Sequence, residues 1–215
     1  VNFEANRLKS IETRETTGVA LRIFLDGRVG FSSTTNLQDL DGLVNTAVDT
    51  APFGAEAHFQ LPGPQIYPEV PVYDSAVGQT SYEEMIWVGQ GVVDGVRSEF
   101  GEVQVEGGIN RAVQTVSLMN TRSAQFQYTK TVYSMGFEGT LIRDTDMLFV
   151  FDVMSSCHPI SDGSELITGM LTQLERAKET VSIQSGTMPV LFTPAAVGGA
   201  LLSPLSAGLN GKWVL

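Results

Sequence analysis

The sequence predicts an α+β protein built on antiparallel strands. Residues 18–34 have the pattern of a β-hairpin, and residues 81–101 have that of an amphipathic helix. Three further strand-like runs follow at 103–119, 124–139 and 146–155, separated only by short polar turns. Strands joined by short turns pair antiparallel, whereas parallel pairs need long crossover connections. A three-stranded meander is therefore the expected topology.

The first expected element is the hairpin within GVALRIFLDGRVGFSST. Aliphatic side chains alternate with others over residues 19–25, and Asp26-Gly27 supplies the two positive φ angles of a tight primed turn. Asn36 or Asp39 can then cap a helix. Its apolar positions recur at helical spacing: Leu37, Leu40, Val44, Ala47, Val48 and Ala51. These elements form an expected N-terminal α+β unit, residues 1–58.

A proline-rich stretch follows this unit. Five of the nine prolines lie between positions 52 and 71. Proline fixes φ and lacks an amide donor, so residues 59–80 are expected to form an extended linker on the surface.

Residues 81–186 are expected to form a middle unit of antiparallel sheet plus helices. Ser81 and Glu84 have the spacing of a capping box at the start of its first helix. The run MLFVFDVM at 147–154 is apolar on both faces apart from Asp152, which predicts a strand buried from both sides.

A second helix is expected to start at Ser161 or Asp162 and to stop before Gly186. Its apolar positions are Leu166, Ile167, Met170, Leu171, Leu174, Ala177 and Val181. Residues 187–215 are expected to begin a C-terminal domain that is truncated here. A short strand at 189–192 and a small-residue helix, broken near Pro204, are expected in it.

Composition restricts the function. The 215 residues carry 13 Lys and Arg against 24 Asp and Glu, a formal charge of −11, which disfavours direct nucleic-acid binding. No apolar run approaches the ~20 residues that span a bilayer, and no charged leader precedes an apolar stretch. The single cysteine, Cys157, excludes an internal disulfide and fits a reducing cytosol. A cytoplasmic protein without a membrane partner is expected.

Three segments carry a resemblance to a known family. They are residues 18–34, the strand pair SLMNTRSAQFQYTKTVYSMGF, and MPVLFTPAAVGGALL near the end. Together they resemble the TldD/PmbA family, labelled modulators of DNA gyrase and understood as a two-subunit metalloprotease system. Members usually carry an Asn-Ser-x-Gly turn between the middle strands, where this chain has Asn120-Thr121-Arg122-Ser123-Ala124, so the turn geometry is expected to differ.

The resemblance also indicates a branch. The TldD-type subunit holds a HExxxH zinc motif in the last helix, whereas residues 201–208 of this chain contain no His, Glu, Asp or Cys. This pattern resembles the PmbA (TldE) branch, which pairs with TldD without holding the metal. The resemblance implies no catalytic, cofactor-binding or metal-binding residue in this chain, and zinc in a TldD-like partner. Whether the chain is an enzyme by itself stays open, and inactivity alone is expected.

Other candidate sites have plainer structural interpretations. A zinc site could combine His58 with Cys157 and His158, and Cys157 and His158 could also act as a nucleophile and its base. Cys157 and His158 are adjacent, however, and adjacent side chains in an extended chain point in opposite directions. Gly89-Gln90-Gly91 lies inside a helix instead of a strand-to-helix turn, so helix packing explains it better than dinucleotide binding. Four acidic residues, Asp144, Asp146, Asp152 and Asp162, lack EF-hand spacing and are expected to be solvated.

Two further sets of residues, arginine and aromatic, are candidates for a functional site. Arg22 and Arg28 flank the hairpin turn and are expected at solvated strand positions. Four aromatic residues of the middle strands could line a peptide groove, although core packing is the plainer use: Phe126, Tyr128, Tyr133 and Phe137.

The preferred hypothesis is a PmbA/TldE-like subunit that shapes the chamber of a peptidase for unfolded or extended peptides, as a dimer with itself or with a TldD-like subunit. The alternative is a stand-alone peptide-binding or regulatory protein. A homodimeric hydrolase that uses Cys157 and His158 ranks last.

Overall fold

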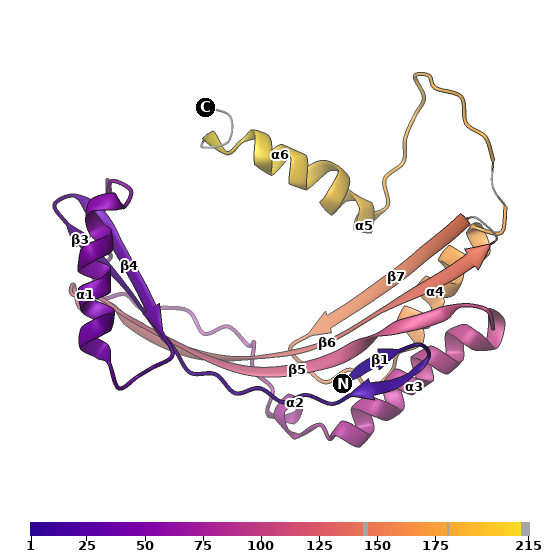
Figure 1. Cartoon of the computed structure of the whole chain (residues 1–215), viewed down its shortest axis with the longest axis horizontal. Coiled ribbons are helices and arrows are strands. Elements are labelled where there is room, and N and C mark those ends of the chain that lie inside the picture. Colours follow the sequence, from indigo (N-terminus) through magenta and orange to yellow (C-terminus); the bar gives the residue numbers. More distant parts are fainter. Residues whose placement is uncertain (144–145, 180, 212–215) are drawn as a thin grey trace. The chain divides into compact units, whose positions relative to one another are not determined.

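The computed structural model describes residues 1–143, 146–179 and 181–211. The chain divides into two compact units, Val1–Lys178 and Glu179–Leu215. The first unit contains a two-stranded hairpin and a five-stranded sheet (Figure 1). Helices and antiparallel sheets together confirm the α+β class.

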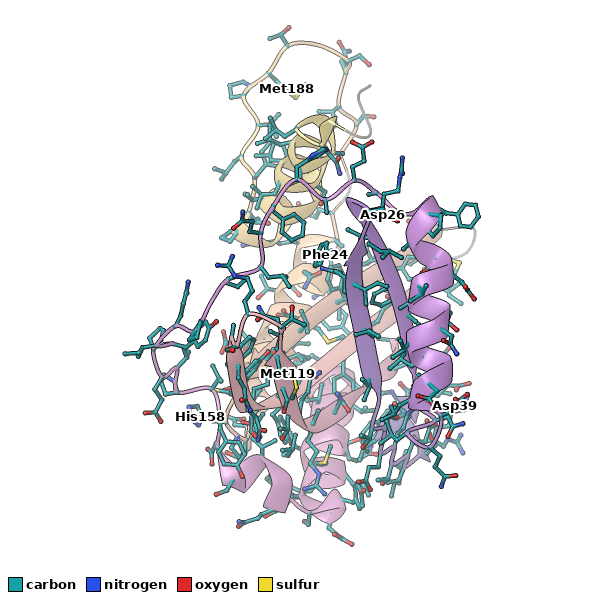
Figure 2. All side chains as sticks on the ribbon, turned by 90° about the vertical axis from the view of Figure 1, so that its left-hand side faces the viewer. Phe24, Asp26, Asp39, Met119, His158 and Met188 are labelled. Carbon is teal, nitrogen blue, oxygen red and sulfur yellow. The ribbon has the colours of Figure 1, made fainter. Side chains whose placement is uncertain are left out.

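The predicted hairpin is confirmed. Strands β3 (Val19–Leu25) and β4 (Arg28–Thr34) pair antiparallel with Leu25 opposite Arg28. Asp26 and Gly27 have φ angles of 49° and 75°, as a primed two-residue turn requires. Asp26 lies at this turn and Asp39 at the start of the helix that follows (Figure 2). That helix is α1 (Leu40–Thr50), and the Asp39 side chain accepts a hydrogen bond from the Gly42 amide at 2.8 Å.

The predicted apolar stripe of α1 is only partly buried. Ala47 and Ala51 are enclosed, as is Leu43, which the predicted stripe omitted. Leu40, Val44 and Val48 remain 40–50% exposed. The helix backbone approaches β4 so closely at Gly30 that a Cβ there would lie 2.0 Å from the Ala47 carbonyl oxygen. Because the residues at this contact are small, α1 packs closely against β4 there. The larger aliphatic side chains of α1 remain exposed to solvent.

The five-stranded sheet has the order β2-β1-β5-β6-β7. Its strands are β1 (Asn2–Glu4), β2 (Arg7–Ser10), β5 (Gln104–Met119), β6 (Gln125–Arg143) and β7 (Asp146–Ser156). All neighbours pair antiparallel, which confirms the predicted meander of β5, β6 and β7. Phe3 lies opposite Gly107, so β1 pairs on one side with its neighbour β2 and on the other with a strand about a hundred residues later in the sequence.

Two helices pack on one face of this sheet, which is called here the covered face. Helix α3 (Tyr82–Glu99) starts with the predicted Ser81–Glu84 capping box, and α4 (Ser164–Arg176) packs against α3 and β7. The core lies between the helices and inward-facing strand residues such as Ile109, Tyr133, Met135, Phe137 and Val150. α4 ends at Arg176, so the predicted extension through Val181 is wrong, because Val181 is 85% exposed and has no apolar surface to cover.

In the described part of the first unit, no helix packs on the opposite face of the sheet, which is called here the open face (Figure 1). Alternate residues of β7 point to it, and Met147, Phe149, Phe151 and Val153 are 52–63% exposed. The prediction that 147–154 is buried from both sides is therefore wrong for this chain. β7 is an edge strand with its apolar partners on the covered face only.

The proline-rich segment follows a short 3₁₀ helix, Ala51–Phe53, and has neither helix nor strand over 57–74. It runs along β6 where β7 no longer pairs. Leu61 accepts a hydrogen bond from Arg122 at 3.0 Å, and the Thr131 amide donates to the Val72 carbonyl oxygen at 2.9 Å. A short helix that the sequence analysis did not anticipate, α2 (Ser75–Gln79), follows, capped by Asp74.

The second unit contains a helical segment. It consists of α5 (Pro194–Val197), a π-helical turn at Gly198–Leu202, and α6 (Ser203–Gly208). Residues 189–192 are not in a strand, so that prediction is wrong, and no strand of this unit offers them a partner in the described residues. Pro204 does not break the helical segment, since the π-helical turn runs directly into α6 and both Leu202 and Ser203 have right-handed helical φ and ψ angles. Among the residues that the structure describes, no helix is long and apolar enough to span a membrane.

Candidate functional site

A basin of about 670 Å³ lies on the open face of the five-stranded sheet. Phe151 and Val153 of β7 line one side, and Glu106 of β5 and Glu138 of β6 line the middle. Asn2 and Glu4 of β1 lie at the other side. The basin therefore crosses the strands, with apolar side chains at the β7 edge and carboxylates toward β1.

Glycines create the hollow. Gly136 of β6 pairs with Gly108 of β5, so two facing positions of adjacent strands carry no side chain. Gly107 has a φ of 149°, and a Cβ there would lie 2.2 Å from the Gly136 carbonyl oxygen. Only glycine fits this conformation and this close approach.

The electrostatics of the basin are acidic. Glu106 and Glu138 lie directly opposite each other on paired strands, an arrangement that is unfavourable for like charges. Glu4 forms an ion pair with Lys9, whereas Glu106 and Glu138 form none with the described residues. The basin can thus receive an apolar group beside β7 and a positive or hydrogen-donating group beside the carboxylates.

The structure places Cys157 and His158 in a different environment. The Cys157 backbone carbonyl accepts a hydrogen bond from the Thr131 hydroxyl at 2.8 Å, and its Sγ lies 4.0 Å from the Pro71 carbonyl oxygen. His158 Nδ1 lies 2.8 Å from Asp74 Oδ2. No contact joins the thiol to the imidazole in the described part of the chain. The pair therefore lacks the geometry of a nucleophile and its base.

The sequence analysis missed Asp74 as the partner of His158. The two residues are 84 positions apart, and only the N-cap position of Asp74 before α2 marks it in the sequence. The pKa of Asp74 lies below its ordinary value of 3.8, because His158 and then the Ala76 amide hydrogen-bond its carboxylate. His58 pairs elsewhere, with Glu56 at 3.2 Å, so the histidines do not share a site.

The other candidates are also separated. Asp162 accepts hydrogen bonds from the Ser164 amide and hydroxyl, which lower its pKa, and Asp152 accepts one from the Val153 amide. Asp146 begins β7, and Asp144 lies outside the described residues. Within residues 1–143, 146–179 and 181–211, no group of three His, Cys, Asp or Glu side chains is placed to hold a metal ion.

The structure also shows the surroundings of Gly89 and of the two hairpin arginines, Arg22 and Arg28. A Cβ on Gly89 would lie 2.3 Å from the Phe3 ring, which confirms helix packing as the reason for this glycine. Arg28 donates to the Gly54 carbonyl oxygen at 2.9 Å and lies 3.8 Å from Glu56, so it has a structural role. Arg22 is exposed.

The four aromatic residues do not form one groove. Tyr133 and Phe137 lie in the core. Phe126 packs against Tyr67 of the proline-rich segment, with ring centroids 5.1 Å apart, and stacks on Tyr128 at 6.1 Å. The peptide-groove hypothesis therefore does not hold for these residues as a set.

Residues 1–51 match the family model described as PmbA/TldA metallopeptidase domain 1. No curated protein matches the sequence. Among solved structures, TldE from Thermococcus kodakarensis is similar with a TM-score of 0.70 and 15% identity, over 84% of this chain and 42% of that one.

Two further structures have the same likeness. A "putative modulator of a DNA gyrase" from Thermotoga maritima MSB8 gives a TM-score of 0.70 and 15% identity, over 86% of this chain and 43% of that one. A "putative modulator of DNA gyrase" from Bacteroides thetaiotaomicron VPI-5482 gives a TM-score of 0.67 and 17% identity, over 79% of this chain and 41% of that one. The chain thus spans less than half the length of these proteins.

At these identities the structures show the fold, which is the α+β fold shared by TldE and these gyrase-modulator proteins. The match of residues 1–51 shows that this segment is similar to the first domain of the PmbA/TldA metallopeptidases.

Proposed function

We propose that this chain is part of a PmbA/TldE-like subunit that shapes the substrate chamber of a TldD/PmbA-type metalloprotease in the cytosol. In this proposal the substrate is an unfolded or extended peptide, and a TldD-like partner or a second subunit completes the dimer. The open face of the sheet is the observation that carries it. Four large apolar side chains of β7 stand exposed there beside the glycine-floored basin.

Such a surface is unusual on a protein that works alone, because contiguous apolar patches mark sites of interaction. An extended peptide can place apolar side chains against β7 and its polar groups against the carboxylates of β5 and β6. The proposal thereby explains why two facing glutamates, Glu106 and Glu138, line the hollow without forming an ion pair with any described residue.

The chemistry of the available side chains supports a non-catalytic role. The family resemblance implies that two imidazoles of the TldD-type subunit bind zinc, while the glutamate of the same motif can activate a water. Residues 201–208, on the π-helical turn and α6, provide only Leu, Ser, Pro, Ala and Gly. These residues do not fit a zinc ion, whose protein ligands are His, Cys, Asp and Glu. No reaction step is therefore assigned to the chain.

The test is reconstitution. The full-length protein would be purified alone and together with a HExxxH-bearing homologue from the same source, and the hydrolysis of an unfolded protein such as casein would be followed. Chelator-sensitive activity is expected only in the mixture, with zinc in the partner.

A variant pair examines the open face in the same assay. Phe151→Asp should reduce casein hydrolysis by the mixture several-fold, whereas Phe53→Asp should not, although Phe53 is 90% exposed. Activity of the chain alone that a chelator abolishes would contradict the proposal. Peptide binding without any partner-dependent hydrolysis would favour the stand-alone binding protein instead.

A further inference from the structure

A second cavity, of about 850 Å³, lies on the other side of the sheet from the basin. Helix α2, the first turns of α3 and the loop at 159–161 form its walls, and Tyr133 of β6 contributes to its lining from the core. Three parts of the sequence therefore build it: residues 76–88, Tyr133 and residues 159–161. His158 and Asp74 tie the loop to α2 at its margin, since their side chains approach to 2.8 Å.

Tyr133 provides a buried polar group in this cavity. Its side chain is only 1% exposed, and its hydroxyl takes part in none of the hydrogen bonds among the described residues. In the same part of the chain, no side-chain nitrogen or oxygen is both completely enclosed and without a partner. The hydroxyl must therefore reach the cavity, where a ligand or water can hydrogen-bond to it.

The phenol oxygen lies in the field of charged neighbours. Burial raises the pKa of Tyr133, the Glu84 carboxylate raises it further, and Arg111 opposes the shift. Tyr133 is thus a neutral phenol at neutral pH, and its oxygen is close enough to Glu84 to sense its charge. Arg111 itself donates to the carbonyl oxygens of Val77 and Gly78 in α2, at 3.2 and 2.5 Å.

Two carboxylates and an indole line the outer part. Glu84 uses Oε2 for the Ser81 amide and hydroxyl, at 2.7 and 3.1 Å, while Oε1 accepts no hydrogen bond from the described residues. Glu83 has no ion-pair partner among them. Trp87 follows Glu83 by one helical turn and is 76% exposed, and Ile160 of the loop also lines the cavity.

We propose that this cavity binds the ammonium group and aliphatic stem of an alkyl amine. The ammonium can donate to the Glu83 and Glu84 carboxylates and to the Tyr133 oxygen, three acceptors within one cavity. The methylene groups then pack on Trp87 and Ile160, where the indole face also attracts the cation. An anion is repelled by both carboxylates. The formal charge of −11 favours cations at long range as well.

This inference does not depend on the proposed function. The same ammonium chemistry occurs in a lysine side chain of a polypeptide and in a free diamine, so three probes are needed. They are Nα-acetyl-lysine amide, 1,5-diaminopentane, and Nα-acetyl-norleucine amide, which keeps the aliphatic stem and lacks the charge.

Binding is measured by NMR titration of the ¹⁵N-labelled protein, with the indole N–H of Trp87 as the reporter and Trp87→Phe to assign its signal. The lysine or diamine probe should shift this signal with saturation, and norleucine amide should bind about tenfold more weakly or not at all. Preference for the lysine amide indicates a polypeptide source, and preference for the diamine a free amine. Equal binding of norleucine amide, or no shift with either amine, would overturn the proposal.

Variants separate a specific site from general attraction to an acidic protein. Tyr133→Phe and Glu83→Gln should each weaken amine binding about five- to tenfold. Glu99→Gln removes the same charge from the exposed far end of α3 and should leave binding unchanged. Tyr133→Phe keeps the ring in the core, and an unchanged urea midpoint verifies that it folds normally. A loss with Glu99→Gln as large as with Glu83→Gln would refute the site.

Discussion

Gly89 and Gly91 of α3 occupy opposite environments. A Cβ on Gly89 would lie 2.3 and 2.6 Å from two atoms of the Phe3 ring, whereas a Cβ on Gly91 would meet nothing within 4 Å. The first glycine lets β1 approach the helix, and the second only adds backbone freedom to the unfolded chain. The same residue type is therefore required at one position and unfavourable at the other.

We expect opposite stability changes from the two alanine variants. Gly89→Ala should lower the free energy of unfolding by about 1–3 kcal/mol, because the ring must move to relieve the overlap. Gly91→Ala should raise it by about 0.5–1 kcal/mol through helix propensity. Urea unfolding followed by circular dichroism measures both, and equal changes would contradict the assigned packing.

The Asp74–His158 pair gives a pH dependence. The pKa of Asp74 is lowered from 3.8 in the folded state, first by His158 and then by the Ala76 amide. The ionised carboxylate is therefore favoured by folding. Its contribution to stability is present above the unfolded-state pKa and is lost as the pH falls through the lowered folded-state pKa.

Asp74→Asn keeps an oxygen for the helix cap and removes the charge. It should lower the urea midpoint at about pH 6, and the gap from the unmodified protein should narrow as the pH falls below about 4. Glu99→Gln serves as the control, since that exposed carboxylate has no ion pair with the described residues. A gap for Asp74→Asn that stays constant with pH would show that the carboxylate is not stabilised by folding.

The sequence predicted helix caps and turns better than it predicted contacts between distant residues. Asp26-Gly27 and the Ser81–Glu84 box were predictable because each depends on neighbours within four positions. The Asp74–His158 pair was not, because the fold brings together residues 84 positions apart. The cavity beside Tyr133 was missed for the same reason. Its lining comes from three parts of the sequence, and none has a local pattern that indicates a cavity.

At the scale of elements, the composition of β7 does not predict which of its two faces is buried. Its apolar side chains alternate between Val150, which is 1% exposed on the covered face, and residues such as Phe149, which is 55% exposed on the open face. A run that is apolar on both faces predicted two covered faces. The sequence could not show that the helices of the first unit cover only one of them.

Two lysine variants of β7 should therefore behave differently. Phe149→Lys should change the free energy of unfolding by less than about 0.5 kcal/mol and should reduce self-association, because an exposed apolar edge strand promotes pairing between chains. Val150→Lys, one residue further, should prevent stable folding by burying an unpaired charge. Sedimentation velocity and urea unfolding test both expectations. A large loss of stability for Phe149→Lys would mean that the open face is covered.

At the scale of the whole molecule, the chain consists of two units with separate contacts. Within the second unit, residues 181–193 contain neither helix nor strand, and they are exposed throughout. The meander and its helices were predictable from local periodicity. The pairing of β1 with β5 was not, because no local pattern indicates which distant strand Phe3 will meet.

Limited proteolysis should cut first within 181–193, because exposed segments without hydrogen-bonded structure are preferred cleavage sites. The fragment 1–178 contains the whole hydrophobic core and should keep the urea midpoint of the intact chain. Mass spectrometry of the fragments and their unfolding curves provide the measurement. First cuts within α3 or β6, or a markedly lower midpoint for 1–178, would contradict the division.

The anchoring of the proline-rich segment on β6 limits how its length can vary. Leu61 is hydrogen-bonded to Arg122, and Val72 is hydrogen-bonded to Thr131. The linker therefore advances eleven residues between these two contacts, while the hairpin advances nine. At ~3.3 Å per extended residue these spans are ~36 and ~30 Å. The linker therefore exceeds this span by at least about two residues. Insertions between these anchors can bulge into solvent, whereas longer deletions must detach one end, so homologues with this architecture should differ here by gains more often than by losses.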